Sequence, residues 1–226
     1  TGTYNGKRLT VISTGIGTDN IDITINELDA LVNIDLKKRE DKEQTTSLDL
    51  VRIGTCGILQ PEVPIHSYIL TSHAFGLDNV AHFYDIKETQ EEAELNKSIN
   101  DHINLPKPIQ TYLSKATDEL FNKLVSNETV EGITITSSGF YGPQGRQLRL
   151  KNSSNALGPL LTSFSKDNNR ITNFEMESSA LFSLGKAMGH KCATICLGIA
   201  NRPNKEFSKD YHPHMMKLIK YVLDRI

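Results

Sequence analysis

The sequence has few cysteines, no long apolar run and no excess of charge of one sign. Cys56, Cys192 and Cys196 are an odd number, and their spacing fits neither a zinc ribbon nor a secreted disulfide framework. We therefore expect a reducing, cytoplasmic location. The longest apolar run, residues 192–200, is far shorter than the roughly 20 residues of a membrane-spanning helix. It predicts a buried strand, and no membrane partner is expected.

The charges of the chain nearly cancel. The sequence contains 25 lysines and arginines against 27 aspartates and glutamates, which gives a net charge of −2. Neither sign forms a long block, whereas proteins that bind nucleic acid or a membrane surface usually carry one. The composition therefore argues against a nucleic acid polymer as the partner and favours a small molecule.

The chain of 226 residues is long enough to bury most of its apolar surface in one sizeable domain. It begins with Thr1 instead of methionine and reaches a strand-like segment almost at once. We interpret residues 1–226 as a single domain that lacks its N-terminal segment.

Short β-rich segments that end near glycine, serine or asparagine recur along the chain. Most are continuous apolar runs, which is typical of strands covered on both faces. The alternating stretch Ile133-Thr134-Ile135-Thr136 instead favours a place near the edge of the sheet. The segments are residues 9–13, 48–53, 67–72, 133–137 and 192–200.

Helical patterns separate these segments. Apolar residues recur every three or four positions after Gly17, from Met176 to a C-terminal cap at Gly189, and from about Met215 to the end. Residues 86–129 are more polar, and we expect them to be helical or looped. Strands that alternate with helices predict a three-layer α/β/α sandwich around a central mixed, largely parallel sheet.

In such sheets ligands bind beyond the carboxyl ends of the strands, and two strand ends could hold an anion. Gly17 closes the turn STGIG, whose backbone N–H groups could receive an anion; a plain strand-to-helix turn is the alternative. Arg52 and Thr55 belong to RIGTCG, where a guanidinium, a hydroxyl and glycine N–H groups suit a tetrahedral oxyanion. The alternative is a surface arginine beside a tight turn.

A third strand end carries the loop GFYGPQGR. Phe140 can stack on a ring, Gln144 offers both a donor and an acceptor, and Arg146 offers donors only. An amide and a guanidinium two positions apart can converge on a base edge that reads O–C–N–H–C–O, as in uracil. The alternative is an ordinary solvated loop.

A fourth strand end carries FEMESS at the start of a predicted helix. Glu175 and Glu177 are either favourable partners of the helix dipole, worth roughly 0.3–1 kcal/mol, or carboxylates that accept hydrogen bonds from vicinal sugar hydroxyls. Two positions apart on a helix the carboxylates diverge, so the acid–base pair of a glycosidase is not indicated.

Five motifs in order, STGIG, RIGTCG, GFYGPQGR, FEMES and LGIANR, cover nearly the whole chain and together resemble the nucleoside phosphorylases of the uridine/purine type. Within this family the chain is most similar to the uridine phosphorylases. Purine-specific bacterial members carry an aspartate after a serine where this chain has Asn201 and Arg202. They also lack the Phe-Tyr-x-x-Gln-x-Arg pattern that begins here at Phe140.

The resemblance implies a site with three parts and a lid. The catalytic roles fall to Arg52, Arg146 and Glu177, and Arg202 lies at the root of a lid formed by residues 203–211. The remaining implied contacts are phosphate with Gly17, Arg52 and Thr55, ribose with Thr55, Glu175, Met176 and Glu177, and uracil with Phe140, Gln144, Arg146, Phe174, Ile199 and Ala200.

The implied reaction is the reversible phosphorolysis of uridine, with deoxyuridine as a further candidate, to uracil and α-ribose 1-phosphate in pyrimidine salvage. Inorganic phosphate is the implied co-substrate, and neither an organic cofactor nor a metal is expected, since His212 and His214 lack companion ligands. The resemblance also implies a homo-oligomer, either a hexamer or a dimer. Three alternatives stay open: a purine nucleoside phosphorylase, a nucleosidase of the same fold, and a non-catalytic nucleoside-binding domain.

One departure from the family concerns the phosphate site. The N-terminal phosphate loop Gly-Asp-Pro-x-Arg has no counterpart in this sequence, and neither do the arginine and the histidine that the family contributes across a dimer. We expect these groups to belong to the missing N-terminal segment.

Overall fold

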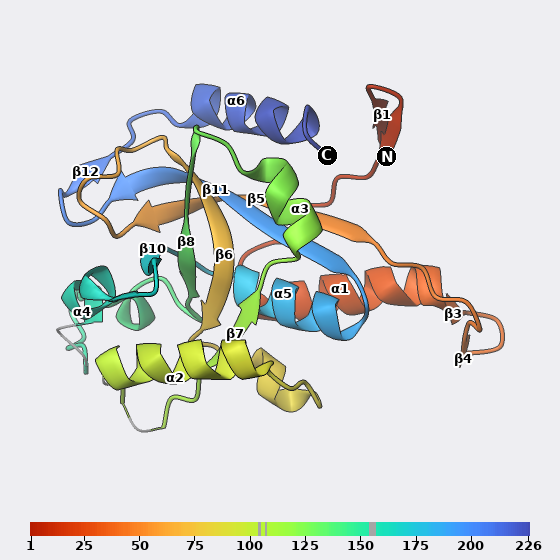
Figure 1. Cartoon of the computed structure of the whole chain (residues 1–226), viewed down its shortest axis with the longest axis horizontal. Helices are drawn as coiled ribbons and strands as arrows, with labels where there is room; N and C mark the ends of the chain where they lie inside the picture. Colours follow the sequence, from red (N-terminus) through yellow and green to blue (C-terminus); the bar gives the residue numbers. More distant parts are fainter. Residues whose placement is uncertain (104, 107, 154–156) are drawn as a thin grey trace.

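The computed structural model describes the whole chain except residues 104, 107 and 154–156. A mixed sheet with five long strands forms its centre (Figure 1). These strands are β5 (Asp49–Ile58), β6 (Tyr68–Gly76), β8 (Thr129–Thr136), β10 (Asn169–Glu175) and β11 (Lys191–Asn201).

The five long strands close on themselves. β5 pairs in parallel with β11, and β8 pairs in parallel with both β6 and β10. The antiparallel pairs β10–β5 and β11–β6 complete the ring. Two short antiparallel strands extend it, β7 (Tyr112–Lys115) beside β6 and β12 (Glu206–Phe207) beside β11. The closure brings strand ends that are far apart in sequence to one region of the molecule.

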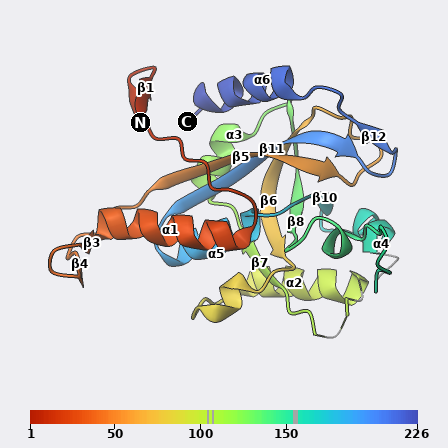
Figure 2. The same ribbon diagram turned by 180° about the vertical axis from the view of Figure 1, so that it is seen from behind.

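Helices cover both faces of β11. On one face α1 (Thr18–Asn33) and α5 (Ser178–Ala187) lie side by side, as Figures 1 and 2 show, and Cys192 packs against them. On the other face α3 (Asp118–Leu124) and α6 (His212–Leu223) pack on alternate residues of the strand, Ala193, Ile195 and Leu197. The predicted three-layer α/β/α sandwich with a central mixed sheet is confirmed.

A third group of helices packs against the other side of the ring. α2 (Gln90–Ile103) and α4 (Leu157–Ser163) share a hydrophobic cluster with β6, β8 and β10 that contains the buried Phe75 and Phe174. The shorter elements are the hairpin strands β1 (Gly2–Tyr4) and β2 (Lys7–Leu9), the hairpin strands β3 (Ile34–Asp35) and β4 (Glu40–Asp41), the strand β9 (Ser165–Lys166), and the 3-10 turns η1 (Val80–Phe83) and η2 (Gly142–Gln144).

Most predicted elements occur where the sequence placed them. β5, β6, β8 and β11 correspond to four of the five predicted strands, and α1, α5 and α6 to the three predicted helices. The polar segment 86–129 contains α2, β7 and α3, so it includes a strand that was not predicted. β10 was not among the predicted β-rich segments, although FEMESS was placed at a strand end and β10 ends there, at Glu175. None of the described helices is long and apolar enough to cross a membrane.

The predicted strand at residues 9–13 is wrong. Only Leu9 is in a strand, the short β2, while Val11 is 88 % exposed and residues 10–15 have no regular structure. An apolar run forms a strand only where a neighbouring strand accepts and donates its backbone hydrogen bonds, and within the described residues no strand lies beside this segment.

The predicted edge position of residues 133–136 is also wrong. β8 lies between β6 and β10, and all four of these residues are buried. The hydroxyl of Thr134 is hydrogen-bonded to Thr71 Oγ1 at 2.7 Å and donates to Asn173 Oδ1 at 2.9 Å. The hydroxyl of Thr136 donates to Glu175 Oε1 at 2.6 Å. The alternation therefore reflects threonine hydroxyls with partners inside the sheet, because a hydrogen-bonded hydroxyl can be buried at little cost.

Candidate functional site

Arg52 is the centre of the first part of the candidate site. It points from β5 toward the end of β10, where its guanidinium forms ion pairs with Glu177 and, at 3.1 Å, with Glu175. Its Nη1 also donates to Cys196 Sγ at 3.3 Å. A Cβ at Gly54 would lie 2.7 Å from Arg52 Nη1, so this position needs a glycine for the guanidinium to fold over the strand.

The backbone of Gly17 joins the same group. Its N–H donates to Glu177 Oε1 at 2.7 Å, while the other carboxylate oxygen of Glu177 accepts from Arg52. Gly17 has a φ of 100°, which is readily available only to glycine. We call Gly17, Arg52, Glu175 and Glu177 the carboxylate cluster. In this cluster two of the three residues predicted to bind phosphate, Gly17 and Arg52, instead contact the carboxylate of Glu177.

Glu175 has both oxygens fully engaged. It accepts from Thr136 Oγ1 at 2.6 Å and from the N–H groups of Glu177 and Ser178 at 2.9 Å, in addition to its ion pair with Arg52. It is 4 % exposed. These contacts fix the turn between β10 and α5, so the geometry supports a role for Glu175 in positioning Glu177.

In the carboxylate cluster, burial and the neighbouring charges act in opposite directions on the pKa values of Arg52 and Glu175. Burial disfavours the charge of Arg52, but Cys196, Glu175 and Glu177 outweigh burial and raise its pKa above the usual arginine value. Burial raises the pKa of Glu175, although Arg52 acts in the opposite direction. One cation and two carboxylates thus share a site from which water is largely excluded.

A second group of side chains gathers at the loop after β8. The guanidinium of Arg146 lies 3.9 Å above the ring of Phe140. The loop turns sharply because Gly145 adopts a φ of 71° and Arg146 N donates to Tyr141 O at 2.9 Å. This turn brings Gln144, which is only 5 % exposed, next to Arg146. We call Phe140, Gln144, Arg146 and Arg202 the guanidinium cluster.

Arg202 belongs to this cluster through several contacts. Its Nη2 donates to Gln144 Oε1, its Nη1 donates to Gln144 O at 3.2 Å, and its guanidinium lies 4.6 Å from the ring centre of Phe174. A Cβ at Gly57 would lie 2.6 Å from Arg202 Nε. That Nε is buried without a hydrogen-bond partner among the described residues. Burial, reinforced by the nearby Arg146, lowers the pKa of Arg202 to about 9.

The predicted lid segment forms a hairpin. β12 pairs with the end of β11, and Ser208 N donates to Ile199 O at 2.8 Å. Asn201 is fully buried and donates to Gln60 O and Val63 O. The hairpin thus starts from a rigid residue, and Arg202 points from its root into the guanidinium cluster.

The remaining predicted site residues lie on the same strand ends. Phe174 precedes Glu175 on β10 and supports Arg202, and Ala200 and Ile199 belong to β11 beside the hairpin. Thr55 lies in β5, Met176 directly follows the end of β10, and both are half-buried. The described residues contain no group of three or more metal-ligating side chains that could hold an ion.

Sequence reasoning missed two parts of this arrangement. No contact was predicted for Cys196, which is fully buried and whose sulfur accepts a hydrogen bond from Arg52. Arg202 was assigned only to the lid, yet it binds Gln144. Arg202 reaches this position because β5 pairs with β11, which brings Gly57 opposite Ala200. A single sequence does not show which strands pair, so it carried no signal for this contact.

Comparison with known proteins identifies relatives over the whole chain. The family described as Phosphorylase superfamily matches residues 1–226. The uridine phosphorylase of Thermococcus kodakarensis is 28 % identical over 215 residues, which cover 92 % of this chain and 64 % of the relative. A DeoD-type purine nucleoside phosphorylase of Oceanobacillus iheyensis is 27 % identical over 197 residues, which cover 86 % and 65 %.

A solved structure is similar at the level of the fold and the sequence. A Trypanosoma brucei nucleoside phosphorylase that shows uridine phosphorylase activity superimposes with a TM-score of 0.89 at 28 % identity. The match covers 99 % of this chain and 81 % of that protein. The chain spans 64 % and 65 % of the length of the two sequence relatives above, which is less than two thirds.

Proposed function

Since the chain belongs to the phosphorylase superfamily, we propose that it catalyses the reversible phosphorolysis of a nucleoside, with uridine as the substrate. A phosphate oxygen forms a bond to C1′ of the ribose while the bond from C1′ to the base nitrogen breaks. The electron pair of that bond leaves with the base, which then takes up a proton. The products are uracil and α-ribose 1-phosphate.

The observation that carries this proposal is the carboxylate cluster. Gly17 N–H and Arg52 converge on one carboxylate, Glu177, so they form a pair of donors arranged around an anion. A phosphate oxygen that takes the place of this carboxylate receives the same two donors. Glu177 is then free to accept hydrogen bonds from the ribose hydroxyls, which is the role the resemblance implies for it.

The two clusters suit the charges that develop in the reaction. Breaking a glycosidic bond builds positive charge on the sugar, and the negative charges of phosphate and Glu177 stabilise it. Negative charge builds on the departing base. Arg146 and Arg202 lie near each other with no carboxylate paired to them among the described residues, so they stabilise the leaving base more than the neutral one.

Uracil fits the donors of the guanidinium cluster. Arg202 binds Gln144 Oε1, so the amide of Gln144 presents its NH₂ group, and Arg146 presents further N–H donors. Uracil carries two carbonyl oxygens that accept such donors. The similarity to a purine nucleoside phosphorylase keeps purine nucleosides as the second candidate. Asn201, which stands where the purine-specific members carry their aspartate motif, is committed to backbone carbonyls.

We further propose that the whole protein acts as a cytoplasmic homo-oligomer, either a hexamer or a dimer, with inorganic phosphate as co-substrate and no organic cofactor. The resemblance supplies the reason, because the family donates an arginine to the phosphate site across a dimer, together with a histidine that reaches the sugar in the neighbouring subunit.

The decisive experiment is a spectrophotometric assay of the full-length protein with uridine and with inosine, each with and without phosphate. Phosphate-dependent loss of uridine is the expected result. Base release that does not need phosphate would identify a nucleosidase instead. Faster turnover of inosine would identify a purine enzyme, and tight uridine binding without turnover a binding protein.

A further inference from the structure

Two buried carboxylates hold the two ends of helix α5, which follows the candidate site. Asp78, just after β6, accepts from Ser179 Oγ at 2.7 Å in the first turn of the helix. Glu92 of α2 accepts from Lys186 Nζ at 2.8 and 2.9 Å in the last turn. Each carboxylate residue is 3 % exposed. The chain therefore contains a matched pair of anchors at opposite ends of one helix.

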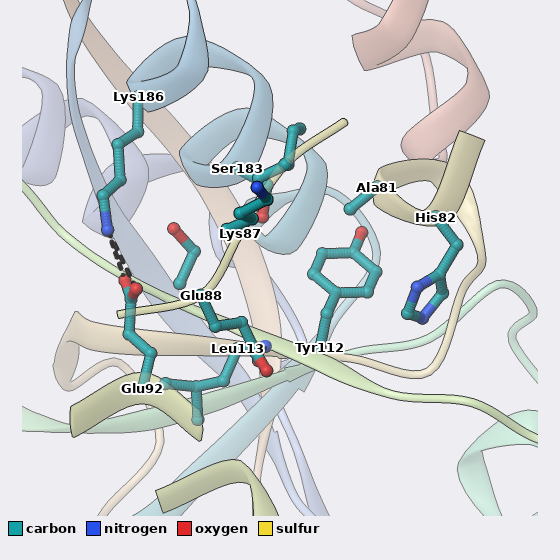
Figure 3. A pocket seen from close by; sticks show the side chains of 11 residues that line it. Ala81, His82, Lys87, Glu88, Glu92, Tyr112, Leu113, Ser183 and Lys186 are labelled. Atoms are coloured by element: carbon teal, nitrogen blue, oxygen red, sulfur yellow. Dashed lines mark hydrogen bonds and ion pairs between the residues drawn. The ribbon is translucent and has the colours of Figure 1, made fainter. Parts of the chain in front are cut away.

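The middle of α5 packs into a hydrophobic cluster with α1, while one side of the helix between the two anchors borders a cavity. A cavity of about 130 Å³ lies there, bordered by Tyr112 at one end, Ser183 in the middle, and Lys186 with Glu92 at the other end (Figure 3). On the two sides of this cavity, Asp78 holds the first turn of α5 and Glu92 holds the last turn by polar contacts.

Asp78 is bound by donors from three elements. Besides Ser179 Oγ it accepts from Tyr112 OH at 2.6 Å and from Val80 N at 2.9 Å. Tyr112 OH also lies 3.0 Å from Ser179 Oγ. The tyrosine ring packs over Gly76, where a Cβ would lie 2.6 Å from it. No lysine or arginine pairs with Asp78 within the described part of the chain. The buried carboxylate oxygens of Asp78 are therefore satisfied by hydrogen bonds from neutral donors.

A continuous chain of hydrogen bonds leads from Asp78 to the carboxylate cluster. Ser179 N donates to Thr136 Oγ1 at 3.0 Å, and Thr136 Oγ1 donates to Glu175 Oε1 at 2.6 Å. The other oxygen of Glu175 accepts from Glu177 N at 2.9 Å. The backbone of Glu177 is thus fixed from the α5 side through Ser179 and from the strand side through Glu175.

We propose that Asp78 is a positioning residue for the ribose-binding carboxylate. It fixes the first turn of α5, and through that turn it sets the direction of Glu177, although it contacts no substrate itself. This inference rests on the proposed function, in which Glu177 accepts the ribose hydroxyls. Glu92 accepts from Lys186 at the far end of the helix and from the backbone N–H groups of Lys115 and Thr89. None of these groups contacts Glu177, so we assign Glu92 to stability alone.

The test compares Asp78→Asn with the matched control Glu92→Gln, and Ser179→Ala is a second variant that removes the same contact from the helix side. The main readout is kcat/KM for uridine relative to 2′-deoxyuridine at saturating phosphate. Asp78→Asn and Ser179→Ala should each lower this ratio about tenfold, since networked residues couple strongly. Glu92→Gln should leave the ratio unchanged, even if this substitution lowers the Tm as much as Asp78→Asn does.

Amide hydrogen exchange supplies a readout that does not depend on turnover. Asp78→Asn should speed exchange in the first turn of α5, and Glu92→Gln in the last turn. An unchanged substrate ratio in both Asp78→Asn and Ser179→Ala, or an equal change in Glu92→Gln, overturns the positioning role. Unchanged exchange in the first turn overturns the anchor itself. A wild-type protein that phosphorolyses neither nucleoside overturns the proposed function, while the exchange data still decide the anchor.

Discussion

The carboxylate cluster and the guanidinium cluster lie on neighbouring strand ends but differ in their charge. In the first, Arg52 faces two buried carboxylates, so its charge is more than neutralised. In the second, Arg146 and Arg202 approach each other, and their partners among the described residues are neutral, an amide and aromatic rings. Under the proposed function, the first cluster exchanges an internal anion for phosphate, whereas the second offers positive charge to a departing base.

Removing each arginine should produce the largest contrast between the clusters. Arg52→Ala leaves Glu175 and Glu177 buried without a cation, at 4 % and 5 % exposure. Breaking such a pair costs about 3–5 kcal/mol of the free energy of unfolding. Arg202→Ala removes a cation that has no carboxylate partner, so the loss should be about 1–3 kcal/mol. Urea unfolding of both variants measures the difference, and equal losses would contradict the assignment of charges.

Arg146→Ala tests the guanidinium cluster by activity. Loss of a donor that stabilises developing charge lowers kcat on uridine about 10²–10³-fold. Arg149→Ala is the matched control, since Arg149 lies three residues further along and is exposed. Steady-state kinetics with uridine and saturating phosphate gives the comparison. Near-normal turnover of Arg146→Ala would refute its role at the base.

Glu177→Gln tests whether this carboxylate occupies the phosphate position. Removing its charge frees Arg52 and Gly17 N–H from an internal anion, so inorganic phosphate should bind roughly three- to tenfold more tightly. At the same time kcat on uridine should fall more than kcat on 2′-deoxyuridine, because the ribose hydroxyls lose their acceptor. Calorimetric titration with phosphate measures the first effect. Weaker phosphate binding in Glu177→Gln would show that the carboxylate does not compete.

The smallest expected effect concerns pH at the hairpin that carries Arg202. The ring of His66 stacks on that of His214 with the ring centres 3.6 Å apart, and His66 Nε2 is hydrogen-bonded to Ser208 Oγ at 2.7 Å. Burial, together with His214, lowers the pKa of His66 below its usual value. The folded state then prefers neutral His66, so the unfolded state binds more protons just below about pH 6.5 and stability falls as the pH drops through that range.

Thermal unfolding between pH 5 and pH 7.5 measures this contribution. The Tm of His66→Asn should depend less on pH than that of the wild-type protein. Asparagine is a suitable replacement because residue 66 has a φ of 70°, a region that asparagine tolerates. Parallel curves for the two proteins would remove His66 as the cause.

The sequence predicted the fold well where a segment carries its own signal. Continuous apolar runs with small residues at their ends gave β5, β6 and β11, and helical periodicity gave α1 and α6. Residues 9–13 show the same kind of run, but beyond Leu9 they pair with no strand among the described residues, so the local pattern alone was insufficient. The threonines of β8 misled for the opposite reason, since their partners Thr71 and Asn173 come from distant strands.

The candidate site was predictable only in part. Arg52, Gln144, Arg146 and Glu177 stand in motifs that are recognisable along the chain. Asp78 stands in no motif, because its partners Tyr112 and Ser179 are 34 and 101 residues away. Which groups share a hydrogen bond depends on strand pairing and helix packing. Such contacts appear only when the whole chain is folded.

Two glycines of β5 leave the space that one arginine of each cluster occupies. Gly54 leaves room for the guanidinium of Arg52 and Gly57 for that of Arg202. A methyl group at either position would push out the flexible side chain that lies over it and leave the strand itself intact. Replacing Gly57 should therefore displace Arg202 while Arg52 keeps its place over Gly54. Under the proposed function, such a substitution changes the contacts with the base and leaves the phosphate contacts intact, which is a short mutational route to a different nucleobase preference.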